Sequence, residues 1–313
     1  MAGEKRMMDF LEKLQTAAGS ALVKEWESMS GHTTFRVGGP ARYFVSPAGE
    51  RELAAVVRLC WEEAVDFYIL GNGSNLLISD QGYDGVMIQM GSGFSGFFGE
   101  SGRPGYYRAG AGLLLSRIAR NVLEDGFSGF EFAAGIPGTL GGAVVMNAGA
   151  YGGEMKDILT CVRVMTPEGE VLELDAKELE LGYRHSCIPE KGYIVLEAEF
   201  CLSAGDPAAI RERMEELAAR RREKQPLEYP SAGSTFKRPE GYFAGKLIEE
   251  AGLKGYRRGG AQVSEKHCGF VINRGGATAD DIRGICRDIR RRVWEISGVT
   301  LETEVKMLGF DET

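Results

Sequence analysis

Apolar residues recur along much of the chain at the spacing of a helix that buries one face. Glu50–Ala64 shows this pattern most simply, and similar runs predict a peripheral helix at Met7–Leu14 and another helix at Leu113–Leu123. The buried stripe expected in Glu50–Ala64 consists of Leu53, Val56, Val57, Cys60 and Ala64. Such one-sided runs predict helices that pack against a core.

Two later helices are predicted by the residues at their ends. Asp206 followed by Pro207 is a typical helix start. The clearest helix begins after Thr278, has Asp281 in the position of a capping box, and ends at Gly298. The inward residues expected are Ile210, Met214 and Leu217 in the first of these helices, and Ile282, Ile285, Ile289, Val293 and Ile296 in the second.

Short β-patterned runs lie between the helices. HTTFRVGGPARYFVSP predicts a strand, a glycine turn and a second strand; FYILGNGSNLLIS predicts a strand, a loop and a strand; GVMIQM continues the pattern. CVRVMTPEGEVLELD predicts a hairpin that turns at Pro167-Glu168-Gly169, and Tyr193–Leu202 predicts a strand. The alternation predicts an α+β fold, with one domain over residues 1–203 and a second over residues 204–313.

Composition and charge narrow the class of function. Hydrophobic residues make up 43% and charged residues 26% of the 313 residues, as in a globular protein with two or three domains. A net charge of −8 argues against nucleic acid as a partner. No apolar run approaches the length of about 18 residues that a membrane span needs. MAGEKRMMDFLEKL lacks the features of a signal peptide, so we expect a cytoplasmic protein. These features leave the oligomeric state open and are compatible with a monomer.

The cysteines and histidines show no metal-binding pattern. The six cysteines contain no Cys-x-x-Cys pair, which in a cytoplasmic protein predicts buried thiols. The three histidines, His32, His185 and His267, lie far apart in the sequence and outside any ligand motif. We therefore expect no metal site. The cysteines are Cys60, Cys161, Cys187, Cys201, Cys268 and Cys286.

Two glycine-rich segments predict a binding site for a nucleotide cofactor. Gly135–Gly153 holds seven glycines in 19 residues, a density that argues against an ordinary helix or strand and leaves backbone N–H groups bare. A second turn, LGNGSN, ends at Asn75. It lacks the third glycine of the dinucleotide fingerprint, because Leu76 stands there, and the chain has no P-loop. An ordinary glycine-rich turn is the alternative for LGNGSN taken alone.

Six blocks of sequence together resemble one known family. GHTTFRVGGPARYF, LGNGSNLLISD, GIPGTLGGAVVMNAGAYGGE, GYRHS, AGSTFKRP and LETEV occur here in the order found in the UDP-N-acetylenolpyruvoylglucosamine reductases, from about His32 to Gly309. The resemblance implies a first domain with the FAD-binding fold of vanillyl-alcohol-oxidase-type (PCMH-type) flavoproteins. It implies a smaller α+β substrate domain after it.

The resemblance also implies a reaction, in which NADPH reduces bound FAD, a hydride passes to C3 of the enolpyruvyl group of a UDP-sugar, and a proton reaches C2. Arg184 matches the family's catalytic arginine, Ser234 its proton donor and Glu304 its acidic partner. Such chemistry needs fixed positive charge and a proton source beside the reacting carbons. From spacing alone, Ser234 is a turn serine and Glu304 is one of several charges on a solvated strand face.

Cofactor and substrate contacts follow from the same match. FAD contacts are expected from Gly71, Asn72, Gly73, Ser74 and Asn75 at the pyrophosphate and from Gly135, Ile136, Pro137, Gly138, Thr139, Asn147 and Ala148 near the ring, with Arg36 and Gly39 as further candidates. The substrate diphosphate is expected to meet basic groups, of which the candidates are Lys224, Lys237, Arg238 and Arg257-Arg258.

The chain departs from part of the family in one respect. The stretch between Arg184 and the predicted domain boundary leaves no room for the tyrosine-bearing loop that some members carry, so the chain resembles the shorter type. Tyr229, Tyr242 and Tyr256 are candidates for closing the site instead. Two rival interpretations are another FAD-dependent oxidoreductase of the same fold with a different substrate, and a nucleotide-binding module without chemistry.

Overall fold

The computed structural model describes residues 2–19 and 23–311, which fall into two compact units. The first unit is Met1–Glu25, Tyr43–Asn72 and Gly85–Ala219, and the second is Trp26–Arg42, Gly73–Asp84 and Arg220–Thr313. The second unit therefore takes in two early segments besides the C-terminal part. The predicted domain boundary at residues 203 and 204 stays a prediction.

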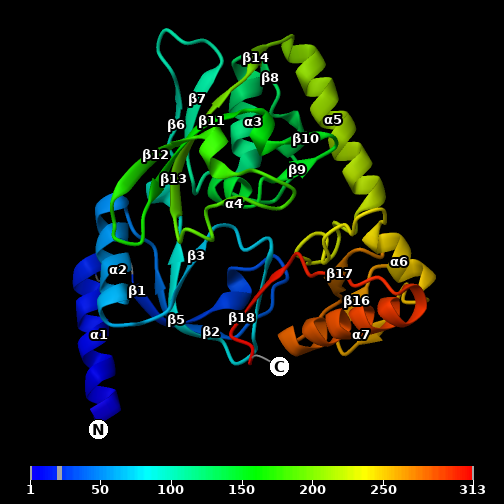
Figure 1. Ribbon diagram of the computed structural model, residues 1–313, viewed down its shortest axis with the longest axis horizontal. Coiled ribbons are helices and arrows are strands. Elements are labelled where there is room, and N and C mark those ends of the chain that lie inside the picture. The colour runs from blue at the N-terminus through cyan, green and yellow to red at the C-terminus, as the bar shows by residue number, and fades with distance from the viewer. Residues whose placement is uncertain (1, 20–22, 312–313) are drawn as a thin grey trace. The chain divides into compact units, whose positions relative to one another are not determined.

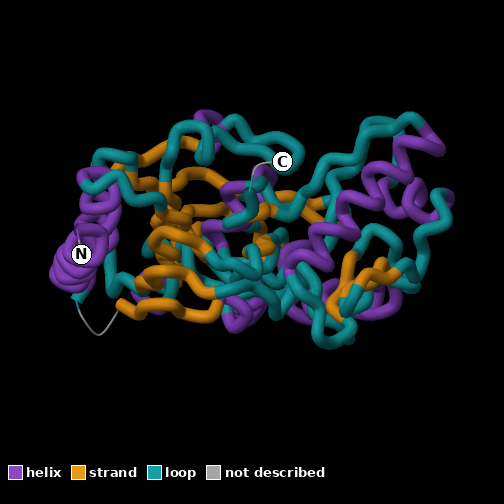
Figure 2. The backbone as a smooth tube through the Cα atoms, turned by 90° about the horizontal axis from the view of Figure 1, so that it is seen from below, coloured by secondary structure: helices purple, strands orange, loops and turns teal. Residues whose placement is uncertain are grey.

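The strands are short, and much of the chain is loop (Figure 2). The helices are α1 (Ala2–Ala18), α2 (Glu50–Glu62), α3 (Leu115–Glu124), α4 (Leu140–Val145), α5 (Pro207–Lys224), α6 (Ala244–Glu250) and α7 (Ala279–Ser297), with 3₁₀ helices η2 (Met29–Gly31), η3 (Ser92–Phe94), η4 (Glu131–Ala133), η5 (Met155–Asp157) and η6 (Ala176–Leu179). The strands are β1 (Val23–Ser28), β2 (Pro40–Val45), β3 (Phe67–Leu70), β4 (Leu76–Ile78), β5 (Tyr83–Gln89), β6 (Phe97–Gly99), β7 (Tyr106–Gly110), β8 (Phe127–Ser128), β9 (Gly149–Ala150), β10 (Gly153–Glu154), β11 (Leu159–Met165), β12 (Val171–Asp175), β13 (Ile194–Cys201), β14 (Ser203–Ala204), β15 (Arg257–Arg258), β16 (Ala261–Val263), β17 (Val271–Asn273) and β18 (Lys306–Leu308).

The first unit is built on an antiparallel sheet of order β12-β11-β13-β7-β6 (Figure 1). Its β11–β12 hairpin turns where predicted, with Gly169 N–H donating to Thr166 O at 3.0 Å. Helix α4 packs on β13 and β7, and the core between them includes the fully buried Phe130, Phe200 and Leu115. Another sheet has the order β1-β2-β5-β3, in which β3 and β5 are parallel. The predicted helices at Met7–Leu14 and Leu113–Leu123 and the predicted strand at Tyr193–Leu202 are confirmed, apart from shifts at their ends.

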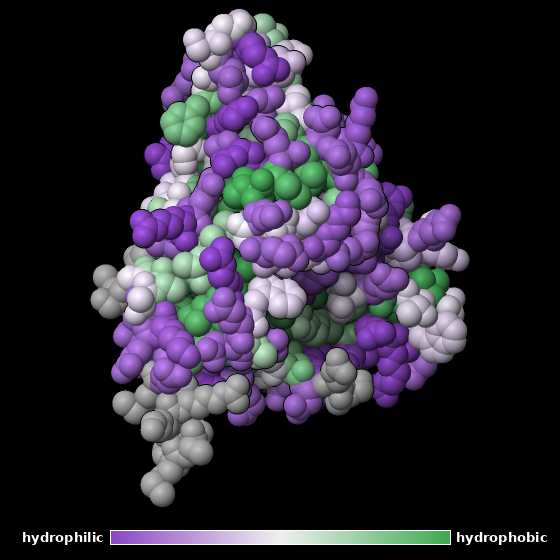
Figure 3. Space-filling model, turned by 60° about the vertical axis from the view of Figure 1, so that its left-hand side comes forward, coloured by the Kyte–Doolittle hydropathy of each residue, from purple (hydrophilic) through white to green (hydrophobic). Residues whose placement is uncertain are grey.

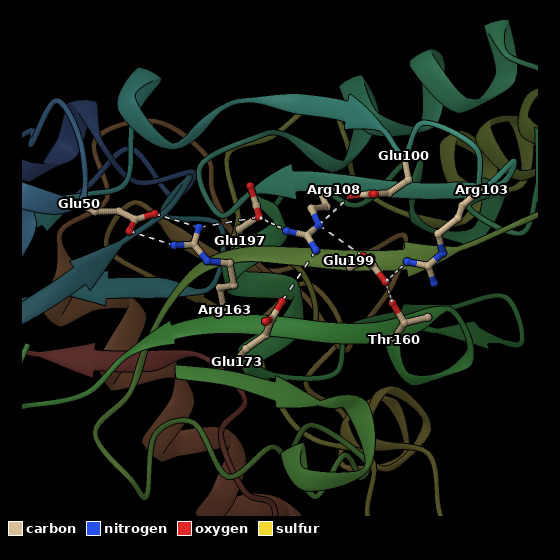
Figure 4. Close-up of polar contacts among 9 residues, drawn as sticks. All are labelled: Glu50, Glu100, Arg103, Arg108, Thr160, Arg163, Glu173, Glu197 and Glu199. Atoms are coloured by element: carbon tan, nitrogen blue, oxygen red, sulfur yellow. Dashed lines mark hydrogen bonds and ion pairs between the residues drawn. The ribbon is translucent and has the colours of Figure 1, made fainter. Parts of the chain in front are cut away.

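The opposite face of the five-stranded sheet carries charged side chains in rows across the strands (Figure 4). Arg108 on β7 lies 2.9 Å from Glu100 and 3.3 Å from Glu199. Arg163 on β11 holds Glu50 at the start of α2 by two bonds of 3.0 and 3.1 Å, a bidentate geometry that fixes orientation as well as charge. Alternation along the strands therefore gives this sheet one apolar face for the core and one charged face. The molecular surface is mostly hydrophilic in the view of Figure 3, with hydrophobic residues in separate small areas.

In the second unit α7 packs against the sheet β15-β16-β17, α6 packs against α7, and β18 pairs in parallel with β4. Thr278 and Asp281 form the predicted capping box of α7, and Gly298 ends the helix at φ +69°. Asp80 adds a contact that the sequence did not indicate: its carboxylate accepts hydrogen bonds of 2.9 Å from both Ala279 N and Asp280 N. These acceptors satisfy N–H groups that have no partner within the helix.

Several sequence predictions were wrong in detail. Residues 32–37 form a turn and not a strand, because Arg36 is left-handed (φ +57°) and the Thr33 hydroxyl donates back to Val37 O. Ala64 lies beyond the end of α2 in a left-handed conformation and is exposed. Ile296 is 52% exposed, since the second unit's core does not extend to the last turn of α7. The glycine-rich segment includes the short helix α4, which was not expected there.

The cysteines are mostly buried, as predicted. Cys60, Cys187, Cys268 and Cys286 are buried, whereas Cys161 and Cys201 are half-buried, and all are free thiols. Burial raises the pKa of the Cys60 and Cys286 thiols to about 12, because a thiolate is poorly solvated there.

The helices in the described part of the chain include none with the length and apolar character that a membrane span requires.

We predict that Ile285→Ala destabilises the protein and that Ile296→Ala does not. Both residues lie on α7, but Ile285 is fully buried and Ile296 is half exposed. Removing the buried side chain leaves a cavity and costs about 2–5 kcal/mol, whereas the exposed change stays within about 0.5 kcal/mol. Urea unfolding followed by circular dichroism measures both, and equal midpoints for the two variants would contradict the assigned core.

We also predict that Cys60 and Cys286 resist modification in the folded protein. A raised thiol pKa leaves almost no thiolate at pH 8, and thiolate is the reactive form. Titration with a disulfide reagent at pH 8, followed by peptide mapping, should find both residues unmodified until a denaturant is added. Labelling of either one in the native protein at the rate of an exposed thiol would disprove this.

Candidate active site

Residues 135–139 form an irregular loop that is hydrogen-bonded to the start of α3. Thr139 pairs with Leu114, and Leu115 N donates to Gly138 O at 3.1 Å. Gly135 and Pro137 are exposed, and Ile136 is half-buried. Of the predicted contact residues 135–139, Gly135 and Pro137 are therefore exposed at the surface of the first unit, whereas Thr139 is buried.

The glycines of this segment serve two purposes. A Cβ at Gly141 would lie 2.8 Å from Ala111 Cβ, and one at Gly153 would lie 2.9 Å from the Phe132 ring, so these positions are glycine because the chain packs on itself. A Cβ at Gly142 would meet only Thr139 Oγ1, at 3.8 Å, and Gly142 is exposed. Some glycines of this segment are therefore required by close internal packing, whereas Gly142 leaves the backbone without a side chain at an exposed position.

The two glycine-rich segments meet within the first unit. Asn72 Nδ2 donates to Pro137 O at 2.6 Å. A Cβ on Gly71 would come within 2.4 Å of Thr139 Oγ1, so a side chain at this position would require the threonine hydroxyl to move. Gly71, Asn72 and residues 135–139, predicted separately to bind one cofactor, therefore lie together.

Arg184 lies at the tip of a tight hairpin in the same unit. Gly182 and His185 exchange two backbone hydrogen bonds, of 3.1 and 3.2 Å, and Arg184 between them is left-handed (φ +54°). Its guanidinium lies 5.2 Å from the centre of the Tyr183 ring, and the residue as a whole is half-buried. Asn147 Nδ2 reaches the base of this hairpin, donating to Gly182 O at 3.0 Å. Ala148, the neighbouring predicted contact, is buried.

The last three residues of the LGNGSN turn, residues 73–75, belong to the second unit. Gly73 is left-handed (φ +60°), and a Cβ there would lie 2.0 Å from His32 O. Asn75 Nδ2 donates to Glu304 O at 3.1 Å, and Lys306 N donates to Asn75 O at 3.1 Å. The Asn75 amide, predicted to contact a pyrophosphate, thus also anchors the chain that carries Glu304. Ser74 between them is half-buried.

Ser234 and Glu304 lie on two segments that run antiparallel. Glu304 N donates to Thr235 O at 2.9 Å, and Phe236 pairs with Thr303. Ser234 is exposed directly before Thr235, and Gly233 turns the chain with φ +73°. Glu304 is half-buried, whereas Glu302 is exposed, which distinguishes two carboxylates that the sequence pattern alone does not separate. The structure therefore brings these two predicted residues together.

The predicted basic residues occupy different settings in the second unit. Lys237 Nζ pairs with Glu302 at 3.1 Å, and Arg238 lies 4.1 Å from the centre of the exposed Phe243 ring. Lys224 is exposed at the end of α5. Arg258 pairs with Asp288 at 3.5 Å.

The remaining predicted candidates have contacts inside the second unit. The Tyr256 hydroxyl donates to Asp288 at 2.9 Å, and Tyr229 stacks with Arg274. Gly39 approaches the backbone so closely that a Cβ would lie 2.2 Å from Asp80 O. Tyr242 is 48% exposed beside the Arg238 segment.

Some residues that shape the site escaped sequence reasoning. Phe243 flanks Arg238, while Ser186 and Glu154 contact the segments around Asn147 and Arg184. A serine or a glutamate in a loop carries no pattern that reveals its partner, because the partner lies far away along the chain. Glu154 lies in the block GIPGTLGGAVVMNAGAYGGE and Ser186 in GYRHS, so the sequence marked both segments but not the contacts between them.

Two family models of known proteins match this chain, one in each of its two parts. Residues 225–308 match the family model "UDP-N-acetylenolpyruvoylglucosamine reductase, C-terminal domain", and residues 41–175 match "FAD binding domain". Wild-type Phl p 4, a glucose dehydrogenase, superposes with a TM-score of 0.51 at 14% identity, covering 64% of this chain and 44% of that one, which shows a shared fold. The predicted α+β fold with an FAD-binding part of the vanillyl-alcohol-oxidase type is confirmed.

Closer relatives span nearly the whole chain. The UDP-N-acetylenolpyruvoylglucosamine reductase of Lachnoclostridium phytofermentans is 53% identical over 300 residues, covering 96% of this chain and 97% of that protein. The crystal structure of UDP-N-acetylenolpyruvylglucosamine reductase from Thermus caldophilus superposes with a TM-score of 0.77 at 36% identity, covering 90% of this chain and 97% of that one. Such similarity over almost the full length shows that this chain belongs to the UDP-N-acetylenolpyruvoylglucosamine reductase family.

Proposed function

We propose that the chain reduces UDP-N-acetylenolpyruvoylglucosamine to UDP-N-acetylmuramate, with FAD as bound cofactor and NADPH as co-substrate, in the synthesis of peptidoglycan precursor. The observation that carries the proposal is the close pairing of the Ser234 and Glu304 segments inside the region that matches the family's C-terminal domain. Another oxidoreductase of the same fold would share the glycine-rich segments but has no reason to keep AGSTFKRP and LETEV. The cytoplasm is the proposed location.

The residues present fit FAD. Gly71, Asn72 and residues 135–139 lie side by side, and Gly135 and Pro137 are exposed. Gly142 adds a position where no side chain intervenes. A glycine-rich turn can direct backbone N–H groups toward a pyrophosphate, and a surface without bulky side chains suits a flat ring. When bound, FAD would supply hydride transfer from NADPH to C3 of the enolpyruvyl group.

Arg184 is proposed to bind the enolpyruvyl carboxylate. Hydride addition at C3 moves negative charge onto C2 and this carboxylate, and a guanidinium is charged at every working pH. The closed hairpin that presents Arg184 sets where its side chain leaves the backbone, and the guanidinium is proposed to be held near the substrate in this way. Charge fixed in advance stabilises a developing anion without a cost of reorganisation.

Ser234 is proposed to give the proton to C2, with Glu304 beside it. A serine hydroxyl is protonated at neutral pH and can donate when the substrate carbon becomes basic. Its exposure on the strand pair is compatible with access to a substrate. Glu304, half-buried on the neighbouring segment, is placed to stabilise the enol form of the substrate through its carboxyl group.

The diphosphate of the substrate is proposed to bind Lys224, Lys237 and Arg238. Lys237 and Arg238 directly follow the Ser234 segment, so substrate binding and proton donation would share one loop. The Lys237–Glu302 pair has exposed partners, and a phosphate can compete for such a lysine at little cost. Residues 1–203 are proposed to hold FAD and residues 204–313 the sugar nucleotide.

An anaerobic titration tests the proposed reaction. The purified protein loaded with FAD should lose its flavin absorption when NADPH is added and regain it when the enolpyruvyl UDP-sugar follows. Bleaching without recovery would retain the flavoenzyme and reject the substrate. A protein that cannot take up FAD would reject the cofactor site as well.

Substitutions test the three proposed catalytic residues. Ser234→Ala and Glu304→Gln should slow re-oxidation by the sugar by roughly 10²–10⁴-fold, the usual size of a lost acid–base group, and Arg184→Ala by about 10²–10³-fold. Reduction by NADPH should stay near normal in all three. Glu295→Gln, on the exposed face of α7, is the control and should react like the wild type. Near-normal turnover in the three variants would reject the assigned roles.

A further inference from the structure

The backbone of Asn147 completes the C-terminus of α4. Asn147 N donates to Val144 O at 3.1 Å, and Ala148 N donates to Ala143 O at 2.8 Å, which is the bonding pattern of a Schellman motif. Asn147 has the left-handed φ of +42° that this motif requires. Glycine usually fills that position, and asparagine is the residue that tolerates it next best. The backbone conformation at this position would be met equally well by glycine, so it does not explain why the residue has the side chain of asparagine.

That side chain is fully engaged by hydrogen bonds inside the first unit. Asn147 Nδ2 donates to Glu154 Oε2 at 2.8 Å and to Gly182 O at 3.0 Å, and Lys156 N donates to Oδ1 at 2.9 Å. Asn147 is only 1% exposed. Both amide hydrogens and the amide oxygen are thus used to join three segments of the chain.

Ser186 makes a second link between the same two regions. Its hydroxyl donates to Val145 O at 2.6 Å, and Ser186 is 2% exposed. Val145 is the last residue of α4, and Ser186 directly follows the Gly182–His185 hairpin. Buried side-chain bonds therefore hold both ends of the hairpin at the end of α4: Gly182 bonds to Asn147, and Ser186 bonds to Val145.

The hairpin held in this way is the one that presents Arg184. We infer that Asn147, together with Ser186, is a positioning residue that fixes the Arg184 hairpin on the end of α4, and that its amide acts through Arg184 and not as a flavin ligand. This inference rests on the proposed role of Arg184. A displacement of a reacting group by about 1 Å can cost 10²-fold in rate, so two buried bonds at the base of the hairpin matter for catalysis.

The substitution Asn147→Gly distinguishes the role of the Asn147 side chain from that of its backbone conformation. Glycine adopts the left-handed conformation without strain, so α4 keeps its end while the bonds to Glu154, Gly182 and Lys156 disappear. The variant should bind FAD with an unchanged absorption spectrum and be reduced by NADPH within about twofold of the wild-type rate, while re-oxidation by the enolpyruvyl UDP-sugar slows by roughly 10- to 100-fold. Hydrogen exchange at the Gly182 and His185 amides should become faster.

Ser186→Ala tests the second link by the same measurements and should show a smaller effect in the same direction. Ser297→Ala is its matched control, because Ser297 makes the same kind of hydroxyl-to-carbonyl bond, of 2.8 Å, to Val293 O at the end of α7. That control should change neither half-reaction.

Several results would overturn the inference. Loss of FAD, or an equal slowing of both half-reactions in Asn147→Gly, would make Asn147 a flavin ligand. Unchanged exchange at Gly182 and His185 would remove the positioning role, and this measurement does not depend on the substrate. Failure of the wild-type protein to be re-oxidised by the sugar would instead reject the proposed function itself.

Discussion

Close approach of one backbone to another is the constraint on which this structure depends. Gly73 stands where a Cβ would lie 2.0 Å from His32 O, and Gly39 stands where a Cβ would lie 2.2 Å from Asp80 O. In both cases the neighbouring atom belongs to the main chain and cannot move aside as the end of a flexible side chain can. Glycine is therefore a requirement of the packing at these places, before any ligand is considered.

Polar side chains then tie these closely packed segments together. Asn72, Asn75 and Asn147 each donate to a backbone carbonyl on a distant segment, and Asp80 accepts from the first turn of α7. Short amide and carboxylate side chains suit this task because they reach only a little beyond the backbone and lose little rotamer entropy. A bond of this kind next to an irregular loop replaces the ladder that a regular strand would supply.

This construction explains why a site of loops can still be well defined. Arg184 lies at the tip of a hairpin of two residues. The hairpin is closed by its own backbone bonds, and the Asn147 amide holds its base by a hydrogen bond to Gly182 O. Ser234 and Glu304 lie on extended segments that pair for only a few residues, and those few bonds set their register. Catalysis by fixed charge needs such support, since a mobile arginine would have to be ordered during the reaction.

The sequence by itself determined the local elements and the chemical types of the site residues. The capping box and apolar stripe of α7, the hairpin at Pro167-Glu168-Gly169 and the two glycine-rich segments follow from periodicity and turn chemistry, which act over a few residues. Roles for Arg184, Ser234 and Glu304 came from the resemblance, since nothing local distinguishes a catalytic serine from a turn serine. Only the tertiary structure decided that Phe35 is buried in a turn, that Ile296 is exposed, and that the Asn147 amide meets the Arg184 hairpin. Those outcomes depend on residues far apart in the chain, whose contacts are set by packing and leave no mark in a local pattern.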